Sequence, residues 1–461
     1  MPAALALFSL LLATALRAQQ AGDPAEARAI FAELIGINST EEHGSTTPAA
    51  RAVAARFLAA GFPAADVAVV GPDSTHLNVV ARFRGTGRQK PILLLAHLDV
   101  VEALPSDWSL DPFRLTEKDG YFYGRGTSDI KDMAAIWVAT ILRLKREGFV
   151  PDRDIIVALT AGEESGVANG VQWLLANRRD LIDAVYCVNG DAGDPLARDG
   201  KVYARTVQAS EKVYMDLELT VHNPGGHSSL PVPDNAIYRL AAALGRLSAF
   251  AFPIRLNEIT RAYFERTAPE ETPAVAKDMR LAGANADPAA LRRLAQVSPL
   301  YNALVRTTCV ATRLEGGHAN NALPQTAQAI VNCRMLPDDV GDSVVAAIRR
   351  VVADTAVTVS VITAPVPSPP SPLAPEVLGP VERITHEMWP GAIVVPNMET
   401  GASDGLYLRN AGMPVYGISA VPLDADDIRA HGRDERIRVA AFDQGVEYGY
   451  RLVRALGGGA P

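Results

Sequence analysis

The sequence has few cysteines, no long hydrophobic run and no basic cluster. Its 461 residues include three cysteines, Cys187, Cys309 and Cys333. They allow at most one disulfide and, without a Cys-x-x-Cys pair, exclude a disulfide framework and a thiolate zinc site. No segment reaches the roughly 18 uninterrupted apolar residues of a membrane-spanning helix. Lys and Arg total 44 against 52 Asp and Glu, a net charge of −8. We therefore expect no stable membrane insertion and no nucleic-acid partner.

The first 18 residues have the pattern of an export signal. The apolar run from Ala3 to Leu16 is too short to span a bilayer, and small residues near Ala15 and Ala18 are typical of a cleavage site. No Lys or Arg precedes the run, so a retained anchor is the alternative. We expect residues 1–18 to be a signal peptide and the protein to be exported, periplasmic or secreted.

Helical and strand-like segments alternate from residue 23 to about 206. The pattern predicts helices at 25–34, 48–60 and 131–147, and strands at 77–84, 91–101, 154–160 and 184–188. Continuous apolar strands between helices are typical of a parallel sheet in an α/β fold. A chain of this length is expected to form about two to three domains.

From about residue 210 apolar and polar residues alternate instead. This pattern predicts antiparallel strands at 213–221, 308–314, 327–334 and 357–362, helices at 235–247 and 342–353, and a polar helical stretch at 255–304. The Pro/Ser-rich run at 363–375 excludes regular structure and predicts a hinge. After it we expect helices at 375–388 and 439–456 and strands at 393–396 and 415–420. The α+β domain at 210–365 is thus expected to be inserted into an α/β catalytic domain, 23–209 and 366–461.

Polar side chains follow the predicted buried strands. His97 and Asp99 close the 91–101 strand, Glu163 and Glu164 follow the 154–160 strand, and Asp191 follows the 184–188 strand. Because the carboxyl ends of strands form the ligand crevice of an open α/β sheet, we expect these side chains to converge. Asp99, two residues after His97, is positioned to fix that imidazole through its other N–H.

Two further residues extend this set: Asp129 precedes the helix at 131–147, and His431 follows the 415–420 strand. Imidazoles and carboxylates without a thiolate suit zinc or a similar borderline ion. They are enough for two ions, with one carboxylate bridging and a position left for water. Of the adjacent Glu163 and Glu164, one can bind metal while the other takes a proton from that water, because adjacent side chains point differently.

Eight segments carry a family resemblance: AHLDVV, YGRGTSDIKDM, TAGEESG, VNGDAG, GGHSSLP, GGHANNALP, TGASDG and AHGRDERI. In this order they resemble the signatures of the dinuclear zinc exopeptidases, the family of glutamate carboxypeptidase, succinyl-diaminopimelate desuccinylase, acetylornithine deacetylase, aminoacylase and carnosine dipeptidase. The resemblance runs from about Ala25 to the C-terminus. It implies a zinc-exopeptidase-like α/β/α catalytic domain with an inserted α+β lid that forms a homodimer. It also implies two Zn²⁺ per subunit, with Co²⁺ or Mn²⁺ as alternatives.

The resemblance also implies which residues hold the metals. His97 and Asp191 would share one ion and Glu164 and His431 the other, with Asp129 bridging both. The peptide bond after Asp129, to Ile130, is a candidate for the cis geometry characteristic of the family.

Catalytic roles follow from the same resemblance. Glu163 would be the general base that deprotonates the bridging water and later protonates the leaving amine. Asp99 would orient the imidazole of His97.

Substrate contacts are implied in the lid and after the hinge. His227 resembles the histidine that reaches the partner's active site and stabilises the tetrahedral oxyanion. Asn321 and Arg334 match residues that bind the substrate's carboxylate, which a guanidinium binds through both oxygens. The backbone of Gly401 and Ser403 would contact the same carboxylate. His318 and Asn320 are weaker candidates, and the four remaining histidines, His43, His76, His222 and His386, are expected to be structural or on the surface.

Three departures from the family pattern bear on the substrate. Asp191 stands where many relatives have Glu, as in the dipeptidase branch, which favours dipeptides. Asp132 replaces a small residue, and nothing in the sequence explains it. The polar helical insert at about 255–305 lengthens the lid, as in the larger secreted and vacuolar carboxypeptidases.

Other functions remain open on the residues alone. Gly401–Gly405 fits G-x-S-x-G, and the aspartates at 424, 426 and 427 followed by His431 give a serine-hydrolase order with Ser403 as nucleophile. No HGGG-like segment accompanies it, and the strand-end carboxylates would have no role. A non-enzymatic relative conflicts with intact Asp99 and Glu163. We predict a metallo-exopeptidase acting on dipeptides or the C-terminal residue of short peptides, with an N-acyl-amino-acid amidohydrolase as the alternative.

Overall fold

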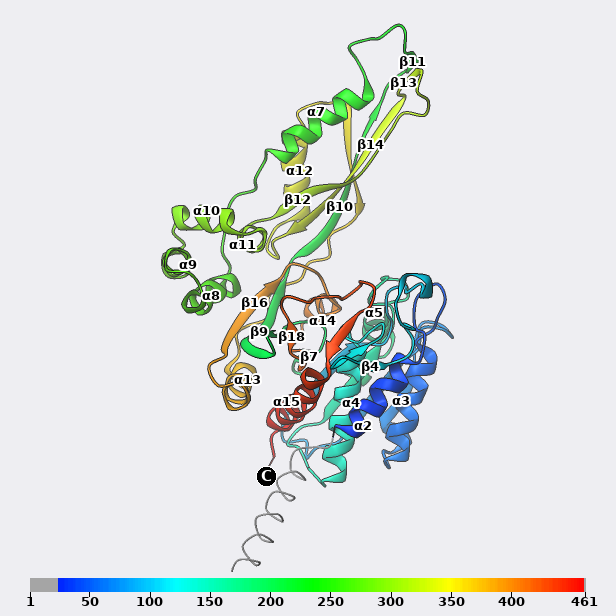
Figure 1. Cartoon of the computed structure of the whole chain (residues 1–461), viewed down its shortest axis with the longest axis vertical. Coiled ribbons are helices and arrows are strands. Elements are labelled where there is room, and N and C mark those ends of the chain that lie inside the picture. Colours follow the sequence, from blue (N-terminus) through cyan, green and yellow to red (C-terminus); the bar gives the residue numbers. More distant parts are fainter. Residues whose placement is uncertain (1–23, 460–461) are drawn as a thin grey trace, which may run out of the picture. The chain divides into compact units, whose positions relative to one another are not determined.

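The computed structural model describes residues 24–459 and divides into two compact units (Figure 1). Among the described residues, the first comprises 24–208, Pro372–Val395 and 411–459; the second comprises Ala209–Ser371 and Pro396–Asn410. The expected signal peptide, 1–18, lies outside the described residues. The segment with Gly401 and Ser403 groups with the second unit, whereas the sequence-based boundaries assign it to the catalytic domain.

The first unit is built on a mixed sheet. Its order is β1-β2-β6-β3-β7-β17-β9-β8-β18. β6, β3, β7 and β17 are parallel, whereas β2 runs antiparallel to β6 and β9 antiparallel to β17. The strands are β1 (Val67–Val70), β2 (Asn78–Phe83), β3 (Ile92–His97), β6 (Ile155–Thr160), β7 (Cys187–Asn189), β8 (Pro195–Arg198), β9 (Lys201–Glu211), β17 (Val415–Gly417) and β18 (Leu423–Asp424).

Every residue of β3 and β6 is buried, as the continuous apolar runs predicted. Helix α4 (Lys131–Arg146) packs against β3, and Trp137 Nε1 donates to the Leu95 carbonyl at 3.2 Å. The other helices are α2 (Ala25–Ile35), α3 (Thr47–Ala59), α5 (Gly170–Asn177), α6 (Arg179–Ile182), α13 (Pro375–Met388) and α15 (Val439–Gly457). A small sheet adds β4 (Thr116–Lys118), β5 (Tyr121–Tyr123) and β19 (Arg436–Arg438). Among the described residues no helix is both long and apolar enough to cross a membrane.

The second unit is an antiparallel sheet in the order β12-β14-β10-β15. Burial alternates along every residue of β14, because one face packs on α7 and α12 while the other faces outward. The strands are β10 (Val213–His222), β12 (Thr308–Gly316), β14 (Thr326–Met335) and β15 (Val357–Thr363), and the helices are α7 (Ala236–Ser248) and α12 (Gly341–Val352). A disulfide joins Cys309 and Cys333, which lie opposite each other on β12 and β14. This agrees with the prediction of at most one disulfide.

The polar stretch at 255–304 forms four short helices in the second unit (Figure 1). They are α8 (Glu258–Thr267), α9 (Pro273–Asn285), α10 (Pro288–Val297) and α11 (Pro299–Val305). The tip of the second unit carries β11 (Gly226–His227) paired with β13 (Ala322–Leu323), and α14 (Gly405–Asn410) belongs to the same unit. Strand β16 (Ile393–Glu399) pairs with β9. The predicted helical character of the insert is confirmed, but prolines divide it because each begins a new helix.

Candidate metal centre

Parallel strands bring the predicted ligands to one edge of the first sheet. His97 is the last residue of β3 and lies opposite Thr160 of β6, and Leu95 lies opposite Asn189 of β7. The loops after β6 and β7, which carry Glu164 and Asp191, therefore begin at the level of His97. The side chains that were predicted to converge at the strand ends do lie close together.

Asp129 lies between the two histidines. Its Oδ1 is 3.1 Å from Nε2 of His97, and its Oδ2 is 2.9 Å from Nε2 of His431. His431 Nε2 is also 3.0 Å from Oε2 of Glu164. One carboxylate thus presents each oxygen to a different imidazole, which is the arrangement of a bridging ligand. The Asp129-Ile130 peptide bond is cis, as expected.

Asp191 and Glu163 lie on the His97 side of Asp129. Asp191 Oδ1 is 3.8 Å from Nε2 of His97. The ligand atoms of His97, Glu163 and Asp191 lie within 4.8 Å of one another, as do those of His97, Asp129 and Glu164. The structure therefore brings together all six residues predicted to bind metal or transfer the proton.

Burial and close charges perturb these groups strongly. Hydrogen bonds to Asp129 and Glu164 raise the pKa of His431 to about 10. Burial opposes protonation of His97, but hydrogen bonds to Asp129 and Asp191 outweigh it and hold its pKa well above the usual value. Burial raises the pKa of Asp191 to about 7, whereas bonds from His431 and His97 overcome the burial of Asp129 and hold its pKa below the usual range. Such opposed shifts in one cluster are typical of a functional site.

The donor set fits two divalent cations. It consists of two imidazoles and a group of carboxylates, which zinc and similar borderline ions accept. Glu164 Oε1 is buried and, within residues 24–459, has no hydrogen-bond partner. A buried carboxylate oxygen of this kind is costly unless a cation or donor satisfies it.

Asp99 contacts His97 differently from the prediction. His97 Nδ1 is 2.9 Å from the backbone carbonyl of Asp99, whereas the nearest carboxylate oxygen of Asp99 is 3.8 Å away. The carboxylate instead accepts from the backbone N–H of Glu164 at 3.0 Å. Because the chain turns directly after β3, the carbonyl reaches the ring first. Asp99 thus fixes the imidazole through its main chain and the Glu164 loop through its side chain.

Glu435 supports the site and was not predicted from the sequence. Its fully buried carboxylate accepts hydrogen bonds from the backbone N–H groups of Ser128 at 2.7 Å and Asp129 at 3.2 Å, and from Arg125 at 2.6 Å. Arg125 in turn donates to the carbonyl of His431 at 3.4 Å. Glu435 therefore connects the Asp129 loop with the His431 loop. Its place in AHGRDERI, four residues after His431, was the available signal.

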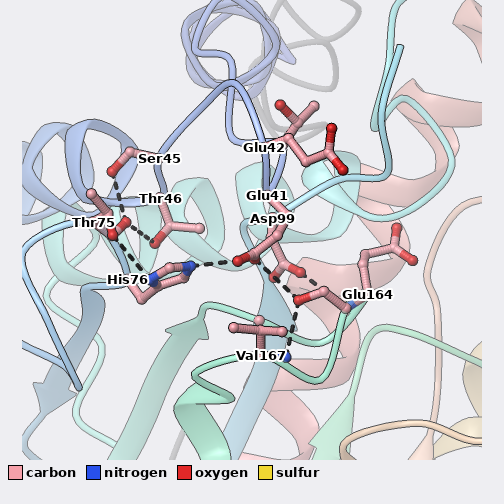
Figure 2. Close-up of polar contacts among 12 residues, drawn as sticks. Glu41, Glu42, Ser45, Thr46, Thr75, His76, Asp99, Glu164 and Val167 are labelled. Atoms are coloured by element: carbon pink, nitrogen blue, oxygen red, sulfur yellow. Dashed lines mark hydrogen bonds and ion pairs between the residues drawn. The ribbon is translucent and has the colours of Figure 1, made fainter.

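A polar network holds the loop that carries Glu164 (Figure 2). Oε2 of Glu41 accepts from the hydroxyl of Ser165 at 3.1 Å and lies 3.3 Å from Nε2 of His76. His76 also contacts Asp73 at 2.9 Å. Burial opposes protonation of His76, but Asp73 and Glu41 outweigh it and raise its pKa. The structural role expected for His76 agrees with these contacts.

His227 and Asn321 lie together at the tip of the second unit. His227 pairs with Ala322 across β11 and β13, two strands that Figure 1 labels. The N–H of Ser228 donates to the Asn321 carbonyl at 3.0 Å. His227 is exposed, and its Nδ1 is 2.7 Å from the hydroxyl of Ser229.

Arg334 lies near the opposite end of β14 from this tip. It pairs with Tyr214, and its guanidinium carbon is 4.6 Å from the centre of the Tyr214 ring. Thr326 and Arg334 are separated by about 26 Å, at the usual rise of ~3.3 Å per strand residue. Within one chain, therefore, the second unit does not bring Asn321 and Arg334 together as a clamp.

Ser403 is bonded to a carboxylate rather than to an imidazole. Its hydroxyl and its N–H donate to Oε2 of Glu211 at 2.9 and 3.1 Å. The same fully buried Glu211 accepts from Arg409 at 2.8 Å and from Ser368 at 2.6 Å. His431 is bonded to Asp129 and Glu164 instead. These contacts do not support Ser403 as a nucleophile.

Replacement of Ser403 by alanine tests this conclusion. Ser403→Ala removes one hydrogen bond to Glu211, so we expect its kcat/KM to stay within about tenfold of the wild-type value. Complete loss of activity, together with covalent labelling of the wild type by a serine-directed fluorophosphonate, would contradict the expectation.

The fold and the centre together define a metal-dependent hydrolase. Residues 93–455 match Peptidase family M20/M25/M40. The chain is 30% identical over 374 residues to N-fatty-acyl-amino acid synthase/hydrolase PM20D1 of Xenopus tropicalis, covering 79% of this chain and 72% of that protein. It is 29% identical over 401 residues to Probable carboxypeptidase S-like 2 of Dictyostelium discoideum, covering 82% and 75%. An M20 family metallo-carboxypeptidase from Sulfolobus solfataricus has a similar structure, with a TM-score of 0.70, 17% identity and coverage of 94% and 99%.

The chain belongs to peptidase family M20/M25/M40. The predicted family and α/β fold class are therefore confirmed, and so is the prediction of a metallo-exopeptidase. A structural neighbour from Bacillus subtilis, with a TM-score of 0.59 and 13% identity, is described as a dinuclear metal-binding peptidase of family M20. The cluster around Asp129 is a candidate metal site in this chain.

Proposed function

We propose that this protein is a zinc-dependent exopeptidase that hydrolyses dipeptides or removes the C-terminal residue of short peptides. The observation that carries the proposal is Asp129, whose two oxygens face His97 and His431 beside the adjacent pair Glu163 and Glu164. His97, Asp129 and Asp191 would hold one Zn²⁺, and Asp129, Glu164 and His431 the other.

Glu163 is the proposed general base. Two bound cations would polarise the scissile carbonyl and lower the pKa of a water. Glu163 takes the proton from that water and delivers it to the leaving amine, which becomes a neutral leaving group. Asp99 and Glu435 act by holding the His97 ring and the Asp129 loop in place.

The substrate's carboxylate is the proposed target of the second unit. Arg334 would bind it through two parallel hydrogen bonds, supported by the backbone of Gly401. The backbone contact predicted for Ser403 is not retained, because its N–H already donates to Glu211. His227 and Asn321 occur at the opposite end of β14 from Arg334. This separation supports a homodimer in which His227 and Asn321 act on the partner's substrate.

Hydrolysis of N-acyl amino acids is the second candidate. The relative from Xenopus tropicalis is named an N-fatty-acyl-amino acid synthase/hydrolase, and the same metals, base and carboxylate clamp would serve either reaction. Asp191 favours the dipeptidase branch of the resemblance.

A substrate panel separates the two candidates. We expect the protein lacking residues 1–18 to hydrolyse dipeptides and tripeptides with a free amino group faster than N-acyl amino acids of the same C-terminal residue. Activity should disappear on chelation and return with Zn²⁺. A reversed preference would replace the peptidase proposal by amidohydrolysis. If metal analysis shows that all metal has been removed and activity still persists, both the peptidase and the amidohydrolase proposals are contradicted.

Mixing two inactive variants tests whether His227 acts in trans. His227→Ala lacks the proposed oxyanion donor and Glu163→Gln the proposed base, so each homodimer is expected to be nearly inactive. A 1:1 mixture with full subunit exchange contains half heterodimers, each with one intact site, and should regain about a quarter of wild-type activity. No recovery despite demonstrated exchange would show that both residues serve the same subunit.

Export to an oxidising compartment completes the proposal. The disulfide Cys309–Cys333 supports it, because such bonds persist mainly in periplasmic and secreted proteins. Cell fractionation of the tagged full chain should find the protein outside the cytoplasm.

A further inference from the structure

A pocket of about 370 Å³ lies in the second unit, in the helical insert. It is formed by the segment before α8, the turn between α9 and α10, the first turns of α10, and the residue that follows α11. This volume is in the range of small-molecule sites, about 300–1,000 Å³. One part of its wall is apolar and includes Phe252, Ile254, Leu256 and Leu291. None of the residues assigned to metal or substrate lines it.

Three guanidinium groups line the rest of the pocket, and no carboxylate does. Arg255 is already neutralised, because it forms ion pairs with Asp338 and Asp339. Arg306 is different: burial lowers its pKa, and its Nε is a buried donor without a partner among residues 24–459. The exposed side chain of Arg292 forms no hydrogen bond or ion pair within the described residues. Two cationic groups beside an apolar wall are thus left without an acidic partner.

We propose that this pocket binds a monocarboxylate with an aliphatic tail, at a site separate from the catalytic centre. The carboxylate would lie between Arg292 and Arg306, because a guanidinium pairs with both oxygens of a carboxylate and a buried donor requires an acceptor. The tail would cover the apolar wall formed by Phe252, Ile254, Leu256 and Leu291. A bare inorganic anion would satisfy the guanidiniums but leave this wall exposed to water.

Calorimetric titration of the zinc-loaded full chain with octanoate tests the proposal. The titration uses an Arg334→Met background, so that the proposed substrate clamp does not contribute. We expect saturable binding of one octanoate per chain. Acetate, which lacks the tail, and octylammonium, which has the opposite charge, should each bind at least tenfold more weakly.

A matched pair of variants on α10 locates the site. Arg292→Gln removes a pocket charge and should weaken octanoate binding at least fivefold. Arg293→Gln removes an equal charge from the adjacent position, but Arg293 is paired with Asp278 at 2.6 and 2.8 Å, outside the pocket. The affinity of the Arg293→Gln variant for octanoate should remain within twofold of that of the Arg334→Met parent. Arg306→Met should weaken binding at least tenfold, and if it fails to fold, the α10 pair decides the question.

Three results would overturn the proposal. The first is the absence of octanoate binding in the Arg334→Met background when the wild type binds it, which would place the ligand at the substrate clamp. The second is equal affinity for octanoate and sulfate, which would indicate a simple anion site. The third is an equal effect of Arg292→Gln and Arg293→Gln, which would indicate a response to net charge.

Discussion

Glu163→Gln is expected to lower kcat by about 10²- to 10⁴-fold, the usual contribution of a positioned general base. The change keeps the size and hydrogen-bonding shape of the side chain but removes its ability to accept the proton. Because Glu163 is assigned to proton transfer rather than to a metal, the variant should retain two metal ions per chain and the wild-type thermal stability. Steady-state kinetics combined with metal analysis of the dialysed protein measures both quantities.

The adjacent residue provides the control for this experiment. Glu164 Oε2 lies 3.0 Å from the imidazole of His431, and its other oxygen is buried without a partner within the described chain. Glu164→Gln is therefore expected to lose metal as well as activity, and added Zn²⁺ should restore part of that activity. If Glu163→Gln loses metal and Glu164→Gln keeps it, the two roles are exchanged.

The metal centre could be predicted because its residues follow from strand order. A buried parallel strand is recognisable from a continuous apolar run, and the residue that ends it and the loop that follows must lie at the carboxyl edge of the sheet. His97, Glu164 and Asp191 satisfy this rule on β3, β6 and β7. Asp129 and His431 do not end a strand of the central sheet, so their grouping depended on the family resemblance as well.

Other features depend on contacts that the sequence does not encode locally. β9 was not predicted, because Lys201–Glu211 mixes charged and apolar residues and becomes a strand through pairing with β17 and β8. Glu435 gains its role only when the Asp129 loop folds onto it, about 306 positions away in the chain. Likewise, the main-chain carbonyl of Asp99 contacts His97 because of the local turn, which the residue type does not specify.

Asp129→Asn is expected to remove the metal centre while preserving the fold. Asparagine matches the volume of aspartate, but it supplies one carbonyl oxygen where His97 and His431 each face a carboxylate oxygen. We expect metal content below one ion per chain and activity lowered by more than about 100-fold.

Asp132→Asn is the matched control on α4. Asp132 is buried, and that burial raises its pKa well above the usual value, which favours the neutral form that an amide resembles. This variant should keep two ions and nearly full activity; equal metal loss in both variants would show that buried charge near the centre matters and that Asp129 has no bridging role.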